Sequence, residues 1–80
     1  MKGARDVVVY TQPHCAGCRE VESFLERRGV TFVVRDVSAD PRALEELAAH
    51  GYMTTPVVRV GDRWVHGARR RDLERLLGAR

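Results

Sequence analysis

The order of apolar and polar positions predicts a strand, a helix and a second strand in the first half of the chain. Residues 7–10 are β-branched or aromatic throughout and predict a buried strand. From residue 16 to about residue 28, Val21, Phe24 and Leu25 recur at helical spacing among charged side chains, which predicts an amphipathic helix that stops at Gly29. Residues 31–37 are again largely apolar, and this succession favours parallel pairing of the two strands with a right-handed crossover.

A second helix is expected to begin at Asp40 and Pro41. Aspartate is a favoured N-cap because its carboxylate accepts hydrogen bonds from the first N–H groups of a helix, and proline fits the first turn. The spacing of the apolar residues that follow predicts that Leu44, Leu47 and Ala48 form the inner face of this helix.

The last third of the chain predicts a β-hairpin and a closing helix. Residues 57–60 and 63–66 are strand-like and flank a two-residue turn at 61–62. The helix that follows is expected to end near Gly78. Its inward-facing residues are expected to be Leu73, Leu76 and Leu77. The predicted order β-α-β-α-β-β-α gives an α/β fold in which helices flank a central four-stranded mixed sheet.

Size and composition predict a single domain that spans residues 1–80. A chain of 80 residues encloses one hydrophobic core, and 44% hydrophobic with 31% charged residues is ordinary for a folded domain. The first six residues contain no apolar stretch long enough for a signal peptide or a membrane span, so we expect a cytoplasmic protein with no membrane partner. The net charge of +3 is too small to predict nucleic-acid binding, and we expect a monomer.

Cys15 and Cys18 form a Cys-x-x-Cys motif where the first strand gives way to the first helix. Unpaired N–H groups and the positive end of the helix dipole stabilise a thiolate at such a position, so Cys15 is the expected nucleophile. Cys18, one turn inside the helix, lies within reach of a disulfide and is expected to resolve the mixed disulfide that Cys15 forms. This cycle requires neither a metal nor an organic cofactor.

The same cysteine pair is also half of a common zinc ligand set. The alternative function is therefore a module that binds or delivers a metal ion or an iron–sulfur cluster, most readily across a dimer. The other half of such a ligand set is not evident, because His14, His50 and His66 are scattered without a second paired spacing. Redox chemistry is the leading interpretation, and no metal ligand is predicted.

Three motifs together resemble the glutaredoxins, and among them the NrdH-redoxins. They are Tyr-Thr-Gln-Pro-His-Cys-Ala-Gly-Cys at 10–18, Thr-Pro-Val-Val at 55–58 and Gly-Asp-Arg-Trp at 61–64. The resemblance implies a thioredoxin-like fold and thiol–disulfide oxidoreductase activity. It implies protein disulfides, with ribonucleotide reductase as one client, or mixed disulfides of small thiols as substrates. The implied reductant is thioredoxin reductase or a low-molecular-weight thiol, namely glutathione, mycothiol or bacillithiol.

The resemblance also implies a substrate-binding surface around the cysteines. It implies a cis Thr55–Pro56 bond, with the proline facing the sulfurs and the Thr55 backbone open to an extended substrate. Gly67 resembles a family glycine that gives a ligand close access just before the last helix. The other expected substrate-binding residues are Pro13, His14 and Ala68.

Three further features have two interpretations each. His14 is either an exposed loop residue or, when protonated, a charge that favours the neighbouring thiolate. The arginines at 69–71 are either solvated surface or a site that attracts an anionic thiol or an acidic partner protein. Trp64 either packs within the hairpin or contacts a partner near Gly67.

Overall fold

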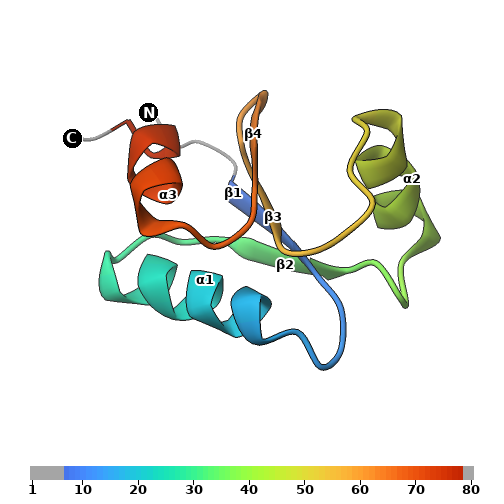
Figure 1. Ribbon diagram of the computed structural model, residues 1–80, viewed down its shortest axis with the longest axis horizontal. Helices are drawn as coiled ribbons and strands as arrows, with labels where there is room; N and C mark the ends of the chain where they lie inside the picture. Colours follow the sequence, from blue (N-terminus) through green and yellow to red (C-terminus); the bar gives the residue numbers. More distant parts are fainter. Residues whose placement is uncertain (1–6, 79–80) are drawn as a thin grey trace.

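The computed structural model describes residues 7–78, and its centre is a four-stranded mixed sheet with the strand order β2-β1-β3-β4 (Figure 1). β1 pairs in parallel with β2, while the β1–β3 and β3–β4 pairs are antiparallel. The element order and the mixed sheet confirm the predicted fold class. The strands are β1 (Val7–Thr11), β2 (Val33–Asp36), β3 (Val57–Val60) and β4 (Arg63–His66).

Helices cover both faces of the sheet. Those on one face share a hydrophobic cluster with β1 and β3, and the helix on the opposite face contributes to a second cluster. None of the helices within residues 7–78 is long and apolar enough to cross a membrane. The two helices of the first face are α1 (Ala16–Arg27) and α3 (Arg70–Leu76), and the helix of the second face is α2 (Pro41–Ala49).

β1 contributes side chains to both hydrophobic clusters. Successive side chains of a strand point to opposite faces, so Val7 and Val9 lie in the cluster of α1 and α3, while Val8 and Tyr10 lie in that of α2. All four residues are at most 7% exposed. Burial on both faces explains why this strand has a continuous apolar sequence rather than an alternating one.

The predicted inner face of α2 was wrong in two of its three residues. Leu47 is buried, but Leu44 is 52% exposed and Ala48 is also exposed. The buried partner of Leu47 is Ala43, one helical turn earlier. Glu46 accounts for the difference, because its carboxylate binds groups of the sheet and thereby turns a polar position of the helix inward.

A polar network at Glu46 joins α2 to the sheet. The hydroxyl of Tyr10 and a guanidinium nitrogen of Arg35 each donate to Oε1 of Glu46 at 2.7 Å, and Arg35 also pairs with Asp40 at 3.2 Å. The hydrogen bonds from Tyr10 and then Arg35 lower the pKa of Glu46. Burial, together with the hydrogen bond to Glu46, raises the pKa of Tyr10. Asp40 is also the N-cap of α2, as predicted, and accepts from the N–H groups of its first turn.

The second strand is shorter than predicted. It covers Val33–Asp36 rather than residues 31–37, and it lies at the edge of the sheet, where Val33 and Val34 remain 59% and 47% exposed. The stop of the preceding helix is as predicted, because Gly29 has a φ of 72°, in the left-handed region that favours glycine.

One row of paired residues lies at the end of the sheet next to the functional site. Tyr10 of β1 lies opposite Val57 of β3, and Val57 lies opposite His66 of β4. The chain leaves this row after Tyr10 toward the cysteine motif, enters it from Pro56, and leaves it again at Gly67. Three segments that are distant in sequence therefore meet at one end of the sheet.

Candidate active site

Cys15 is the N-cap of α1, at the junction of strand and helix that the sequence predicts. Its backbone is extended, with φ −115° and ψ 102°, and its Sγ accepts a hydrogen bond of 3.1 Å from the backbone N–H of Cys18. The sulfur therefore occupies the position that a capping oxygen takes in most helices. An N–H group at the positive end of the helix dipole is directed at it.

The two cysteines form a disulfide, and their Cα atoms are 5.3 Å apart. This confirms that two intervening residues bring the sulfurs together within one helical turn. Their environments differ, since Cys15 is half-buried whereas Cys18 is only 3% exposed. A disulfide substrate approaching from solvent therefore meets the sulfur of Cys15.

The loop before β3 faces the sulfur of Cys15. The Thr55–Pro56 bond is cis, as the resemblance implied, and Oγ1 of Thr55 lies 3.6 Å from Sγ of Cys15, within hydrogen-bond distance for sulfur. Pro56 is buried against the motif. A Cβ at Gly17 would stand 3.2 Å from Cδ of Pro56, so the glycine permits a close approach of the proline ring.

The segment between β4 and α3 completes the site. The N–H of Gly67 donates to the carbonyl oxygen of Pro56 at 2.9 Å, which fixes the two loops to each other. Gly67 has a φ of 99°, a conformation that side chains disfavour. The Cβ of Ala68 lies 3.9 Å from the position that a Cβ would take at Gly17. These close approaches bring the segments of Gly17, Pro56 and Ala68 together beside the two cysteines.

Pro13 and His14 lie on the turn between β1 and Cys15, and both are exposed. His14 has a φ of 61°, which is unusual for a residue other than glycine. Their exposed positions directly before Cys15 place both residues at the rim of the site. A role of Pro13 or His14 in substrate binding stays a prediction.

Trp64 is half-buried and packs against the hydrophobic cluster on the α2 side of the sheet. Its ring stacks on those of His50, at a centroid distance of 4.0 Å, of Tyr10 at 5.5 Å and of Tyr52 at 6.0 Å. His66, beside it on β4, is hydrogen-bonded through Nε2 to Oγ1 of Thr54 at 2.6 Å.

These contacts hold the segment 50–54 that leads into Thr55 and Pro56. Sequence reasoning missed this supporting role, because it treated His50 and His66 only as possible metal ligands. Local sequence gave no signal for it, because the closest stacking joins His50 and Trp64, which are 14 positions apart in the chain. Within residues 7–78, no group of three or more histidine, cysteine, aspartate or glutamate side chains is arranged to hold a metal ion.

Known proteins resemble this chain in sequence and in fold. The profile of the glutaredoxin family matches residues 7–65. The glutaredoxin-like protein NrdH of Escherichia coli K12 is 36% identical over 56 residues, which cover 70% of this chain and 69% of that protein. The structure of NrdH-redoxin from Escherichia coli has a TM-score of 0.82 with 34% identity, over 89% of this chain and 93% of that one. The thioredoxin-like protein BC3987 has a TM-score of 0.83 with 32% identity, over 89% and 99% of the two chains. The chain therefore has a thioredoxin-like fold and belongs to the glutaredoxin family of thiol–disulfide oxidoreductases.

Proposed function

We propose that this protein reduces disulfides of client proteins through a dithiol cycle in which Cys15 is the nucleophile and Cys18 the resolving residue. The observation that carries the proposal is the difference between the two sulfurs. Cys15 is half-buried at the N-cap of α1, whereas Cys18, one turn inside the helix, is buried.

Three groups around Cys15 support its role as the attacking sulfur. The backbone N–H of Cys18 donates to Sγ at 3.1 Å, and the hydroxyl of Thr55 lies 3.6 Å from it. The helix dipole of α1 adds a favourable electrostatic interaction with a negative charge at the same place. Each of these interactions is stronger with a thiolate than with a thiol, so reduced Cys15 carries the nucleophilic sulfur.

The cycle transfers two electrons to the client. The Cys15 thiolate attacks one sulfur of the client disulfide, forming a mixed disulfide and releasing the other client sulfur as a thiolate that takes up a proton. Cys18 then loses its proton and attacks the sulfur of Cys15, which releases the second client thiol. The protein is left with the Cys15–Cys18 disulfide, the state that the structure describes.

An extended client backbone fits beside the Thr55–Pro56 loop. Thr55 precedes the first paired residue of β3, and its hydroxyl already reaches the sulfur that the client approaches. We propose that the main chain of Thr55 pairs with the client backbone as an added strand. Gly67 and Ala68 bound the other side of this path, and Pro13 and His14 bound the rim next to Cys15.

Thioredoxin reductase is the proposed source of electrons, and ribonucleotide reductase is one proposed client. Both follow from the similarity to NrdH-redoxin, a glutaredoxin-like protein with a thioredoxin-like activity profile. The segment after β4 supports this choice of reductant, because it reads Gly67-Ala68 followed by three arginines, whereas many glutaredoxins have two glycines followed by acidic residues. We also propose that residues 1–80 form a single domain, and that the protein acts as a monomer in the cytoplasm.

The test is NADPH oxidation with a protein disulfide and, in separate reactions, thioredoxin reductase or each small thiol with its own reductase. We expect sustained turnover with thioredoxin reductase, none for Cys15→Ser, and a trapped mixed disulfide of protein and client for Cys18→Ser. Parent-rate reduction by Cys15→Ser would overturn the cycle, and turnover with a small thiol alone would overturn the choice of reductant. Stoichiometric zinc or iron–sulfur absorption in freshly purified protein would favour the metal-binding alternative instead.

A further inference from the structure

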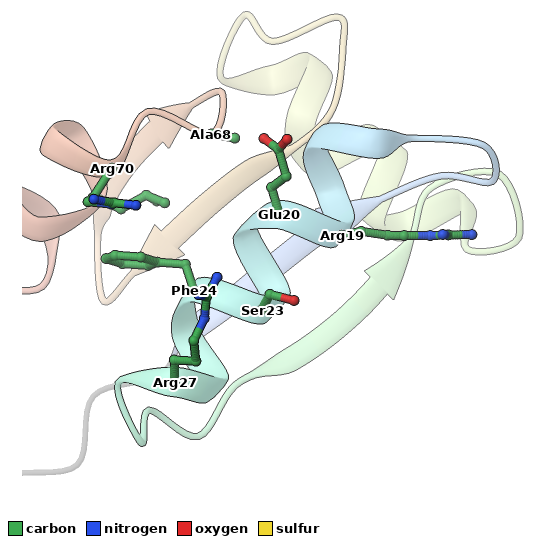
Figure 2. A pocket seen from close by; sticks show the side chains of 8 residues that line it. Arg19, Glu20, Ser23, Phe24, Arg27, Ala68 and Arg70 are labelled. Atoms are coloured by element: carbon green, nitrogen blue, oxygen red, sulfur yellow. The ribbon is translucent and has the colours of Figure 1, made fainter.

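A groove of about 490 Å³ lies between α1 and α3 and opens beside the cysteine motif. Figure 2 shows the side chains of Phe24, Arg27 and Arg70 converging on it, with Glu20 directed toward Ala68 at its upper end. Ala68 is the residue that approaches the glycine between the two cysteines. The groove therefore begins at the redox site and extends away from it along α1.

The residues that line the groove include three arginines and a single glutamate, so the lining has an excess of positive charge. Within residues 7–78, neither Arg27 nor Arg70 lies within ion-pair distance of a carboxylate, whereas the neighbouring Arg28 pairs with Glu74 at 2.9 Å. Arg70 stands in the first turn of α3, where the helix dipole disfavours a cation. These two guanidinium groups face each other across an apolar floor that includes Phe24.

The length of the groove indicates what fits it. From Gly17 to Arg27 the helix advances ten residues, or about 15 Å, and an extended chain covers that distance in about four or five residues. An apolar floor with guanidinium groups at its rim is complementary to a segment that combines apolar and carboxylate side chains.

We propose that this groove binds an acidic segment of the client protein, with carboxylates about four or five residues from the cysteine that Cys15 attacks. The inference rests on the proposed function and adds a substrate class to it. Arg27 and Arg70 are the specificity-determining residues, and Phe24 contacts the apolar part of the segment.

Two synthetic peptides test the proposal. Each contains the same intramolecular Cys-x-x-Cys disulfide, and the flanking segment carries two glutamates in one peptide and two lysines in the other, at about four and five residues from the cysteine. Their kcat/KM values are measured with thioredoxin reductase and NADPH. We expect the acidic peptide to be reduced about five to ten times faster, with the preference falling as salt is added.

Charge-reversal variants show which arginines cause the preference for the acidic peptide. We expect the double variant Arg27→Glu/Arg70→Glu to lose this preference or to reduce the basic peptide faster. Arg71→Glu is the matched control for Arg70→Glu, since it makes the same charge change one residue later outside the groove lining, and we expect it to retain at least half of the preference. Melting temperatures of the variants show that each is folded.

The outcomes separate this inference from the proposed function. Equal rates for both peptides in the parent protein would overturn the inference and leave the dithiol cycle intact, whereas reduction of neither peptide would overturn the cycle itself. A preference that Arg71→Glu removes as fully as the groove variants would mean that general surface charge, and not the groove, is responsible. If the groove variants instead slowed only the turnover of glutathione mixed disulfides, the site would serve a small anionic thiol and the client segment would be wrong.

Discussion

Glu46→Ala removes the hydrogen-bond acceptor of a hydroxyl that has no contact with water. Tyr10 is 0% exposed and donates to Glu46 at 2.7 Å, so the variant leaves its buried O–H donor without this acceptor, at a cost of about 1–3 kcal/mol. The lost ion pair with Arg35 adds less than about 1 kcal/mol, because the two side chains are 21% and 37% exposed. We expect a loss of about 2–3 kcal/mol, which lowers Tm by about 10–20 °C in a domain of this size.

Urea unfolding of the oxidised protein, followed by circular dichroism, measures this loss. Glu45→Ala is the matched control, because it changes the same residue type in the same helix at an exposed position, and it is expected to stay within about 0.5 kcal/mol of the parent. In Tyr10→Phe the ring needs no acceptor, so the double variant Tyr10→Phe/Glu46→Ala should be more stable than the sum of the two single changes by about 1 kcal/mol. Strict additivity, or equal losses for Glu45→Ala and Glu46→Ala, would refute the argument.

Three further predictions concern the pH dependence of stability, the N-cap of α3 and two glycines with positive φ. The hydrogen bonds from Tyr10 and Arg35 lower the pKa of Glu46 in the folded state. They therefore stabilise the fold above the unfolded pKa of about 4.3, and this stability is lost as the pH falls through the folded pKa. Between pH 7 and pH 3, the urea midpoint of Glu46→Gln should thus fall less steeply than that of the parent protein. Arg69→Ser gives α3 the side-chain cap that it lacks and should raise stability by about 0.5–1 kcal/mol in urea unfolding, so an unchanged midpoint would contradict the cap assignment. Gly67→Ala and Gly61→Ala both place a side chain at positive φ and should each cost about 1–2 kcal/mol. Alanine keeps its N–H group, but relief of the backbone strain at residue 67 would shift the N–H that donates to Pro56, so only Gly67→Ala should also lower kcat/KM several-fold. Equal kinetic effects of the two substitutions would show that this hydrogen bond does not position the site.

The sequence predicts what depends on local chemistry. Strand and helix order follow from apolar periodicity, and the role of Cys15 as N-cap follows from its place at the junction of β1 and α1. Asp40 is recognised as a cap for the same reason, because its partners are the N–H groups two and three residues later. Interactions of this range are visible in the sequence itself.

Features set by distant partners were not predicted. The inner face of α2 depends on Glu46, whose partner Tyr10 lies 36 residues earlier, so apolar spacing alone assigned Leu44 wrongly. The place of Pro56 against the cysteine motif depends on β3 lying beside β1, so it was expected only from the resemblance and not from local sequence. The cis bond before Pro56 was expected from the resemblance, because cis and trans forms of an X-Pro bond differ by only about 0.5–1 kcal/mol and local sequence does not decide between them.

The proposed roles of the two cysteines, attacking for Cys15 and resolving for Cys18, are consistent with the period of α1. The buried residues of this helix are Cys18, Val21 and Leu25, which are spaced by three and four positions and form its apolar stripe. Cys18 is thus the first member of the stripe, whereas Cys15 lies one residue before the helix and takes the N-cap. A motif with two intervening residues therefore places one sulfur on the core-facing stripe and the other at the exposed start of the same helix. The helical period that stabilises the fold also decides which sulfur a client meets first.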